Sequence, residues 1–240
     1  MFAVVLAGGM GKRMKSALPK VLHKVCGKPM ILHILDQLGS MKQVEKVVVV
    51  VGYKRALVKK VLPKMAKTAV QKKMLGTGDA VKSARYHFKK YDGNILILCG
   101  DTPLIKAKTL EKVLKIHEEE ENAATIVTTF VRDPAGYGRI LRNREGQVLG
   151  IVEEKSATVL EKKIKEINTG IYCFASKKLY YALSRIRKDK IKGEYYLTDA
   201  IEILRKKRLK IGTALAKDSG EVMGVDDLFR LKAAEKYLRG

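Results

Sequence analysis

Hydrophobic and polar positions follow two successive patterns along this chain, and the change between them falls near residue 123. In the first part, short aliphatic runs typical of fully buried strands alternate with segments of helical spacing. The predicted strands are Phe2–Leu6, Lys46–Val51 and Asn94–Leu98, and the predicted helices are Pro29–Leu38, Ala56–Leu62, Asp79–Phe88 and Thr109–Glu121. This alternation is typical of right-handed βαβ units around a parallel sheet that is covered on both faces.

The pattern after residue 123 is richer in strands and turns. The run ATIVTTFV predicts one strand, and Arg139–Arg142 and Gln147–Val152 predict a hairpin around the turn Asn143–Gly146. The remaining predicted elements are a strand at Ile167–Phe174, helices at Ser176–Arg187 and Thr198–Lys207, a strand at Leu209–Ala216, a short strand before Asp226 and a last helix at Asp226–Leu238. Since no repeat or low-complexity linker interrupts the chain, we expect one domain over residues 1–240. Its class should be α/β, with a doubly wound, mostly parallel sheet and a β-rich lobe.

Composition adds limits on size, compartment and metal chemistry. With 240 residues and 46% hydrophobic content, the chain can bury a large core. Its longest aliphatic run, Val47–Val51, is far shorter than the roughly 20 residues that cross a bilayer, so we expect no membrane segment. No basic segment precedes Phe2, which favours a cytoplasmic, unprocessed protein. Cys26, Cys99 and Cys173 are odd in number and far apart, so they predict reduced, mostly buried thiols rather than disulfides or a metal site.

The formal net charge of +24 points to an anionic partner. Nucleic acid is one candidate, but the lysines are spread along the chain, tryptophan is absent and aromatic residues make up only 6%. The densest basic cluster, RKKRLK at Arg205–Lys210, falls at a predicted junction between helix and strand, where cations are ordinary. The composition therefore disfavours nucleic acid and leaves small phosphate-rich substrates as the alternative.

The opening segment LAGGMGKRMKSALPKVL joins a predicted strand to a glycine-rich turn with basic residues. Its small and basic members of interest are Gly8, Gly9, Gly11, Arg13 and Lys20. Glycines permit tight turning and positive φ, so backbone N–H groups can approach an anion, while the two cations add charge. An ordinary glycine-rich turn is the alternative, because Met14 departs from the dinucleotide-binding pattern and Arg13 departs from the P-loop pattern.

Two aspartates are candidates for binding Mg²⁺. Asp101 follows the hydrophobic run LILCG, which places its carboxylate at the carboxyl end of a predicted strand. A helix cap or an Asp-Thr-Pro turn explains the same local sequence equally well. Asp226 is the best second carboxylate, although Asp226 and Asp227 can equally cap the last helix.

Taken together, motifs over nearly the whole chain resemble one family. The segments are LAGGMGKRMKSALPKVL, QKKMLGTGDA, CGDTPL, GYGRI, IVEEKSA, INTGIY, GEYYLTDAI and VMGVDD. In order and approximate spacing they resemble the uridylyltransferase domain of bacterial bifunctional N-acetylglucosamine-1-phosphate uridylyltransferases, which also act as glucosamine-1-phosphate acetyltransferases. The resemblance implies a Rossmann-like nucleotidyltransferase fold, in which residues 1–122 mainly bind nucleotide, residues 123–225 mainly bind sugar and residues 226–240 form a helix.

The resemblance also implies an activity. It is the Mg²⁺-dependent transfer of UMP from UTP to N-acetylglucosamine 1-phosphate, which gives UDP-N-acetylglucosamine and pyrophosphate by in-line attack at the α-phosphorus. Because the sugar phosphate carries the nucleophilic oxygen, no protein nucleophile is needed. The alternative is another sugar-1-phosphate nucleotidyltransferase that uses UTP or dTTP with glucose 1-phosphate. A more remote alternative is a non-catalytic, basic nucleic-acid-binding protein.

The site residues implied by the resemblance fall into four groups. Arg13 and Lys20 act on the phosphates, and Asp101 and Asp226 bind Mg²⁺. The nucleotide-binding residues are Leu6, Ala7, Gly8, Gly9, Gly11, Gln71, Gly76 and Thr77. The sugar-binding residues are Gly138, Glu153 and Asn168.

Several positions depart from the family pattern. Lys12 stands where Thr is usual, Gly8 where Ala is common, Cys99 where Tyr is common and Asp226 where Asn is common. Asp should still bind Mg²⁺, with more negative charge. No hexapeptide-repeat acetyltransferase segment follows, so we expect either a monofunctional enzyme or a fragment.

Overall fold

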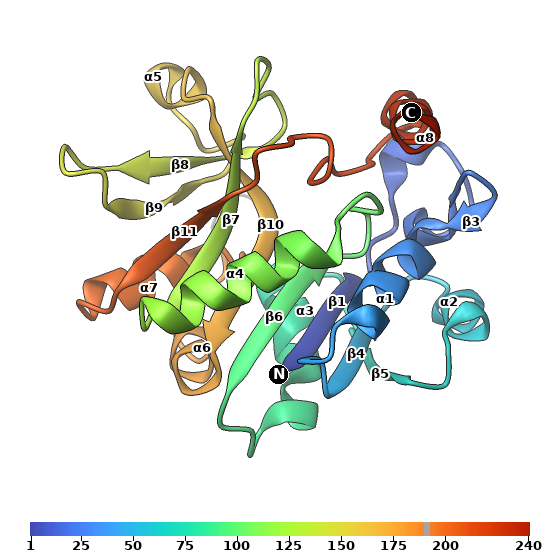
Figure 1. The fold of residues 1–240 in the computed structure, drawn as a ribbon, viewed down its shortest axis with the longest axis horizontal. Coiled ribbons are helices and arrows are strands. Elements are labelled where there is room, and N and C mark those ends of the chain that lie inside the picture. The colour runs from blue at the N-terminus through green and yellow to red at the C-terminus, as the bar shows by residue number, and fades with distance from the viewer. Residues whose placement is uncertain (190–192) are drawn as a thin grey trace.

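The computed structural model describes residues 1–189 and 193–240, in which a nine-stranded sheet lies between two layers of helices (Figure 1). The sheet strands are β1 (Phe2–Ala7), β4 (Lys46–Val51), β5 (Ala66–Val70), β6 (Asn94–Cys99), β7 (Ala124–Phe130), β8 (Gly138–Arg142), β9 (Val148–Val152), β10 (Glu166–Ala175) and β11 (Ile211–Leu215). The helices are α1 (Met30–Ser40), α2 (Arg55–Val61), α3 (Thr77–Ala84), α4 (Ala107–Glu119), α5 (Val159–Lys162), α6 (Ser176–Leu183), α7 (Asp199–Lys206) and α8 (Leu228–Arg239). A small hairpin of β2 (Lys24–Val25) and β3 (Lys28–Pro29) lies apart from the sheet.

The sheet combines a parallel half with an antiparallel insertion. Strands β6, β1, β4 and β5 are parallel neighbours, and β11 is parallel to β7 at the other edge. Strand β10 is antiparallel to both β6 and β7, and it also carries the β8–β9 hairpin. The predicted α/β class with a mostly parallel sheet is confirmed, and the β-rich second part joins the same sheet.

Alternating side chains of the central strands feed two separate cores. In β1, Ala3 and Val5 pack with α1 and α4, whereas Val4 packs on the opposite face with α3, α6 and α7. These three strand side chains are completely buried. Burial on both faces is the physical reason why the parallel strands appear in the sequence as continuous aliphatic runs.

The carboxyl ends of the parallel strands bring distant segments into contact. The amide of Gly100, after β6, donates to the carbonyl of Leu6 at 2.8 Å, and the amide of Tyr53, after β4, donates to Gly8 at 3.0 Å. A Cβ on Gly52 would lie 2.6 Å from the Gly8 carbonyl oxygen, so the two loops touch through their backbones. This edge of the sheet is where ligands bind in doubly wound folds.

Several predicted boundaries were wrong. Helix α6 ends at Leu183, four residues before the predicted end, and residues 221–225 form no strand before Asp226. Helix α3 ends at Ala84, and the predicted continuation to residue 88 is a separate 3-10 turn. Strand β5 was missed because its sequence AKTAV is short and partly exposed, and α5 was missed because it is a single turn. The thiol of Cys26 is exposed rather than buried.

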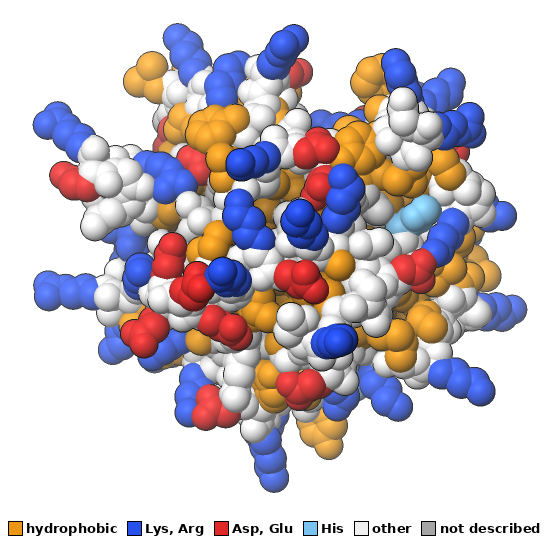
Figure 2. Space-filling model, in the orientation of Figure 1, with side chains coloured by type: hydrophobic (Ala, Val, Ile, Leu, Met, Phe, Trp, Pro, Cys, Tyr) orange, Lys and Arg blue, Asp and Glu red, His pale blue; other side chains and the backbone are white. Residues whose placement is uncertain are grey.

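The excess of positive charge does not mark a particular element. Figure 2 shows Lys and Arg side chains scattered over the whole visible face. Within the two described ranges, no helix is long and apolar enough to span a bilayer.

One buried histidine provides a test of the core. His117 of α4 is 2% exposed, and its Nδ1 lies 2.9 Å from the Thr125 hydroxyl of β7. Burial lowers the pKa of His117 from 6.5 to about 4, so the unfolded chain binds this proton more readily than the folded chain does. The corresponding stability is complete above pH 6.5 and decreases as the pH falls toward 4.

Lowering the pH from 7 to 4.5 should reduce the free energy of unfolding of both the wild type and His117→Gln. We expect the reduction to be smaller by about 2 kcal/mol in the variant. The free energy of unfolding, measured with urea at both pH values, checks this difference. The pH dependence of the wild type alone is not sufficient, because Asp199 changes stability in the opposite direction. Burial, together with nearby carboxylates, raises the pKa of Asp199 to about 6, so this group adds stability as the pH falls. His87→Gln, at a half-buried site, is the control for the loss of a histidine as such. A wild-type pH slope in His117→Gln would contradict the prediction.

Candidate active site

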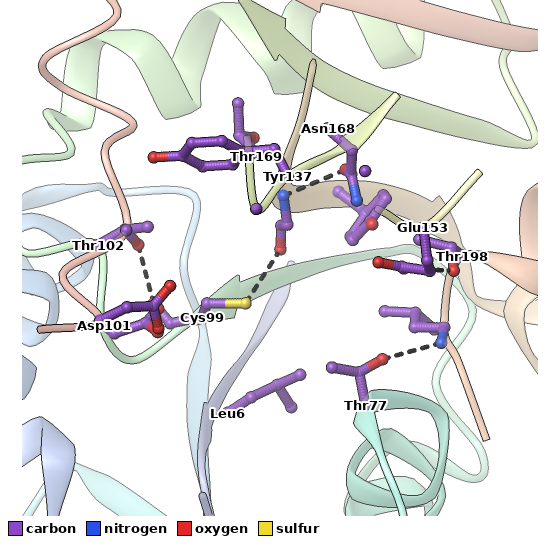
Figure 3. A pocket seen from close by; sticks show the side chains of 17 residues that line it. Leu6, Thr77, Cys99, Asp101, Thr102, Tyr137, Glu153, Asn168, Thr169 and Thr198 are labelled. Carbon is purple, nitrogen blue, oxygen red and sulfur yellow. Dashed lines mark hydrogen bonds between the residues drawn. The ribbon is translucent and has the colours of Figure 1, made fainter. Parts of the chain in front are cut away.

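Two adjoining cavities open at the carboxyl edge of the sheet. One, which we call the loop-side cavity, lies beside the glycine-rich loop and has an empty volume of about 890 Å³. The other, the hairpin-side cavity, lies beside β8–β10 and has an empty volume of about 730 Å³ (Figure 3). The two cavities share four lining residues, Leu6, Thr77, Cys99 and Asp101. Together they form one continuous cleft with two compartments.

Most residues predicted to bind nucleotide line the loop-side cavity. They are Leu6, Ala7, Gly8, Gly9, Gln71, Gly76 and Thr77. Lys20 lines the same cavity. Glu194 and Tyr196 also line it. The sequence analysis assigned them no role, because they lie far along the chain from the other residues of this cavity. The segment GEYYLTDAI was the only signal that could have found them.

The hairpin-side cavity gathers the residues predicted to bind sugar. Gly138, Glu153 and Asn168 line it together with Asp101 and Asp226. In the sheet, Gly138 at the start of β8 lies directly opposite Asn168 of β10, and Glu153 directly follows β9. Of the predicted residues in the described ranges, Gly11 and Arg13 line neither cavity.

The three glycines of the opening loop have different roles from those predicted. Of the three, Gly11 alone has a positive φ, of 70°, so it alone uses the conformational freedom that glycine offers. A Cβ on Gly11 would lie 2.5 Å from the Lys20 Cβ, and a Cβ on Gly8 would lie 2.6 Å from the Gln71 Oε1. Gly11 therefore sets the position of Lys20, and Gly8 makes room for the Gln71 amide.

Gln71 is held firmly at the end of β5. It is 5% exposed, and its Nε2 donates to the Gly76 carbonyl at 3.1 Å and to the Asp79 carboxylate at 2.9 Å. These bonds orient the amide so that its oxygen lies against Gly8. A buried and oriented amide is suited to recognising the edge of a base, because it presents an acceptor in a fixed place.

A cluster of opposite charges lies where the two cavities meet. The Lys20 Nζ donates to the Asp101 carboxylate and to the Asp226 Oδ1, the second at 2.7 Å. The other oxygen of Asp226 lies 2.8 Å from the Arg13 Nη2 and 3.8 Å from the Arg230 Nη1. Arg13 thus reaches the site through Asp226, although it does not line a cavity.

Burial and charge act in opposite directions on this cluster. Burial alone lowers the pKa of Lys20, but the charges of Asp101 and Asp226 outweigh it and hold that pKa above the ordinary value. Burial raises the pKa of Asp226, whereas Lys20 and the two arginines outweigh it and hold that pKa below the ordinary value. The lysine is therefore cationic and Asp226 anionic at neutral pH.

The start of α8 shows that Asp226 does not cap the last helix. Asp227 caps this helix, since its Oδ1 accepts from the Arg230 amide at 2.8 Å. The Val225 amide donates to the Asp101 carbonyl at 2.8 Å, which brings the preceding segment to the end of β6. Asp226 therefore faces Lys20 instead of capping the helix. The Asp101 carboxylate is likewise engaged by Lys20 and not by a helix terminus.

A β-bulge shapes the wall of the hairpin-side cavity. The register of β10 against β7 shifts between Asn168 and Tyr172, and Gly170 within the bulge has a φ of 78°. The Gly170 amide donates to the Asn168 Oδ1 at 3.1 Å, and the Cys99 thiol lies 3.7 Å from the Gly170 carbonyl oxygen. Burial raises the pKa of Cys99 to about 12, so this thiol is neutral.

The paired aspartates fit a magnesium ion. No group of three or more His, Cys, Asp or Glu side chains suited to a metal occurs in residues 1–189 and 193–240. Mg²⁺ usually takes one or two protein carboxylates and completes its shell with water and substrate oxygens. Asp101 and Asp226 could supply these two carboxylates. The Lys20 ammonium lies between them in this structure and would have to move aside for an ion held by both.

Comparisons with known proteins identify the family of this chain. The sequence profile of the family described as "Nucleotidyl transferase" matches residues 2–226. The chain is 48% identical to the bifunctional protein GlmU of Limosilactobacillus reuteri and 47% identical to that of Brevibacillus brevis, in each case over 99% of this chain. It spans only 52% and 51% of those relatives, or about half their length.

A solved structure shares the fold. It comes from Bacillus anthracis and is provisionally described as a glucose-1-phosphate thymidylyltransferase in complex with a sucrose. The TM-score is 0.77, the sequence identity is 20%, and the match covers 100% of this chain and 96% of the other. At this identity the likeness establishes a nucleotidyltransferase-like fold and no specificity.

The packing of Gly11 against Lys20 leads to a first prediction for the site. Gly11→Ala should lose about 1 to 3 kcal/mol of unfolding free energy, because the new Cβ combines positive-φ strain with a clash against Lys20. Gly9→Ala is the matched control, since a Cβ there meets nothing within 4 Å and should change stability by less than about 0.5 kcal/mol. Urea unfolding measures both, and equal effects would contradict the assignment.

The charge cluster leads to a second prediction. Lys20→Met leaves two half-buried carboxylates facing each other and should cost about 3 kcal/mol of unfolding free energy at pH 7. The loss should shrink as the pH falls toward 4, because protonation relieves the repulsion in the variant. Adding Asp226→Asn to Lys20→Met should recover part of the loss at pH 7. A loss that does not depend on pH would show that the lysine acts through packing alone.

Proposed function

Because this chain belongs to the nucleotidyl transferase family, we propose that it transfers UMP from UTP to N-acetylglucosamine 1-phosphate. The products are UDP-N-acetylglucosamine and pyrophosphate. The observation that carries this proposal is the cleft itself, in which two compartments meet at a cluster of Lys20, Asp101 and Asp226. A nucleotidyl transfer needs this arrangement, since two substrates must meet with their phosphates side by side.

The phosphates would lie at the boundary between the compartments. There Lys20 and Arg13 can neutralise the charge on the α-phosphate and on the departing pyrophosphate. In the structure both cations contact Asp226, so their nitrogen atoms are held at the boundary before a substrate arrives. Such preorganised charge supports an in-line displacement in which the sugar phosphate oxygen attacks the α-phosphorus.

Mg²⁺ is part of the proposal, with Asp101 and Asp226 as the residues that would hold it. When bound, the ion supplies charge neutralisation and alignment for the reacting phosphates. Asp226 carries one more negative charge than the Asn that is common in the family, and Arg13 and Arg230 lie within 4 Å of it as compensating cations. The substitution therefore leaves the chemistry of the donor set suitable for Mg²⁺.

Base and sugar would occupy opposite compartments. The loop-side cavity would take uridine, with the oriented Gln71 amide, Gly76 and Thr77 facing the uracil. The hairpin-side cavity would take the acetylated sugar, where Glu153 can accept from sugar hydroxyls and Asn168 can both donate and accept. Gly138 permits close approach of the sugar to the backbone of β8.

We also propose the division of labour along the chain and its compartment. Residues 1–122 would mainly bind nucleotide, residues 123–225 would mainly bind sugar, and residues 226–240 contribute a C-terminal helix. The three cysteines are free thiols, which agrees with a reducing compartment such as the cytoplasm.

Pyrophosphate release measured with a panel of substrates tests the function. UTP and dTTP are each combined with N-acetylglucosamine 1-phosphate and with glucose 1-phosphate, with Mg²⁺ or with excess EDTA. We expect the highest kcat/KM for UTP with N-acetylglucosamine 1-phosphate, and no release in EDTA. A preference for dTTP or glucose 1-phosphate would overturn the specificity, and no release from any pair would overturn the activity. The Lys20→Met variant, assayed only after circular dichroism has shown that it is folded, serves as the control that lacks the proposed phosphate contact.

A further inference from the structure

One short segment, residues 195–198, contacts the walls of both compartments. It follows Glu194 and leads directly into α7. Tyr196 lines the loop-side cavity, and Leu197 and Thr198 line the hairpin-side cavity. Leu197 is 1% exposed and Thr198 is 5% exposed, whereas Tyr195 and Tyr196 are half-buried, so the segment passes from the surface into the interior.

Three hydrogen bonds fix this segment to the nucleotide half. The Tyr195 amide donates to the Leu75 carbonyl at 2.7 Å, and the Gly78 amide donates to the Tyr195 carbonyl at 2.8 Å. The Leu197 amide donates to the Thr77 hydroxyl at 2.9 Å (Figure 3). The backbones approach closely, because a Cβ on Gly76 would lie 2.6 Å from the Tyr195 carbonyl oxygen. The position of residues 195–198 is therefore set by the loop before α3 and by the first turn of that helix.

The next side chain along the segment reaches the sugar half. The Thr198 hydroxyl donates to the Glu153 Oε1 at 2.9 Å, as Figure 3 shows. Threonine at the start of a helix usually caps it by accepting a backbone N–H in the first turn. Thr198 stands at that position of α7, yet among the described residues its side chain makes no capping bond. The hydroxyl is thus used for Glu153 at the expense of the helix start.

Glu153 needs such a partner to keep one orientation. It directly follows β9 and has three side-chain torsions, whose freedom must be restricted before the carboxylate can bind a ligand efficiently. Burial raises the pKa of Glu153, the bond from Thr198 opposes that shift, and the charge of Glu194 adds to it. The Thr198 hydroxyl therefore both orients the carboxylate and favours its charged, accepting form.

We propose that Thr198 is a positioning residue for sugar recognition, which holds the Glu153 carboxylate toward the hairpin-side cavity from a segment anchored on the nucleotide half. The inference rests on the proposed function, since it takes the hairpin-side cavity as the site of the sugar phosphate. It adds a residue to which the sequence analysis gave no role. It also explains why Thr77 borders both cavities, because its hydroxyl anchors the segment that carries Thr198.

The test compares Thr198→Val with Thr198→Ser. Valine keeps the shape but removes the hydroxyl, so we expect the KM for N-acetylglucosamine 1-phosphate to rise about tenfold, as for loss of a hydrogen bond to a charged group. The KM for UTP and kcat should each stay within about twofold of wild type. Serine keeps the hydroxyl and should restore the KM for the sugar phosphate to within about threefold.

Thr129→Val is the matched control for loss of a buried threonine hydroxyl. Thr129 is 2% exposed, and its hydroxyl donates to the Ala216 carbonyl at 2.9 Å, outside both cavities. It should lower the unfolding free energy without changing either KM. If Thr198→Val leaves the KM for the sugar phosphate unchanged, raises both KM values equally, or is not rescued by serine, the positioning role is wrong.

Binding of UDP-N-acetylglucosamine, measured by titration calorimetry, separates this inference from the proposed function. If the wild type binds this compound but releases no pyrophosphate, the proposed activity is wrong. The positioning role can then still be tested through the Kd for UDP-N-acetylglucosamine. In that case Thr198→Val should weaken binding about tenfold, and Thr198→Ser should not. An unchanged Kd in Thr198→Val, or no binding by the wild type, would overturn the positioning role.

Discussion

The ammonium of Lys20 lies between the carboxylates of Asp101 and Asp226, and the remaining geometry of the site depends on this contact. It joins three segments that are far apart in sequence, namely the opening loop, the end of β6 and the segment before α8. A lysine at this depth loses hydration, and the loss is offset because two carboxylates lie within contact. Gly11 is part of the same constraint, since any side chain there would collide with Lys20 and separate the three segments. The charge that a triphosphate would meet is thus assembled by packing.

Much of the scaffold was predictable because it follows from burial. Short runs of β-branched aliphatic residues, such as Val47–Val51, favour strands covered on both faces, and the predicted strand Lys46–Val51 is confirmed without a change of boundary. Local rules failed where an element is short or half exposed, as in β5 and α5, or where a helix ends without a proline or glycine, as α6 does at Leu183. In these places tertiary contacts decide the boundary, and no local signal records them.

The site was predictable to a different extent. The sequence predicted Lys20, Asp101 and Asp226 as candidate site residues, and the structure brings them together at one boundary. It could not decide between capping and ligation for Asp226, because that depends on whether the neighbouring Asp227 takes the cap. Nor could it find Thr198, since a threonine before a helix has the same sequence signature whether it caps the helix or holds a carboxylate. Only the direction of the hydroxyl separates the two roles.

The boundary between the compartments also shows why the two halves of the chain cannot be treated as independent binding units. Leu6 and Thr77 belong to the first half but help to line the hairpin-side cavity, and Tyr196 belongs to the second half but lines the loop-side cavity. The Cys99 thiol from β6 lies against Gly170 in the bulge that shapes the opposite wall. Because protein interiors are closely packed, a change in either wall displaces its neighbour across the boundary. If base and sugar bind as proposed, their recognition would therefore be coupled through this shared boundary.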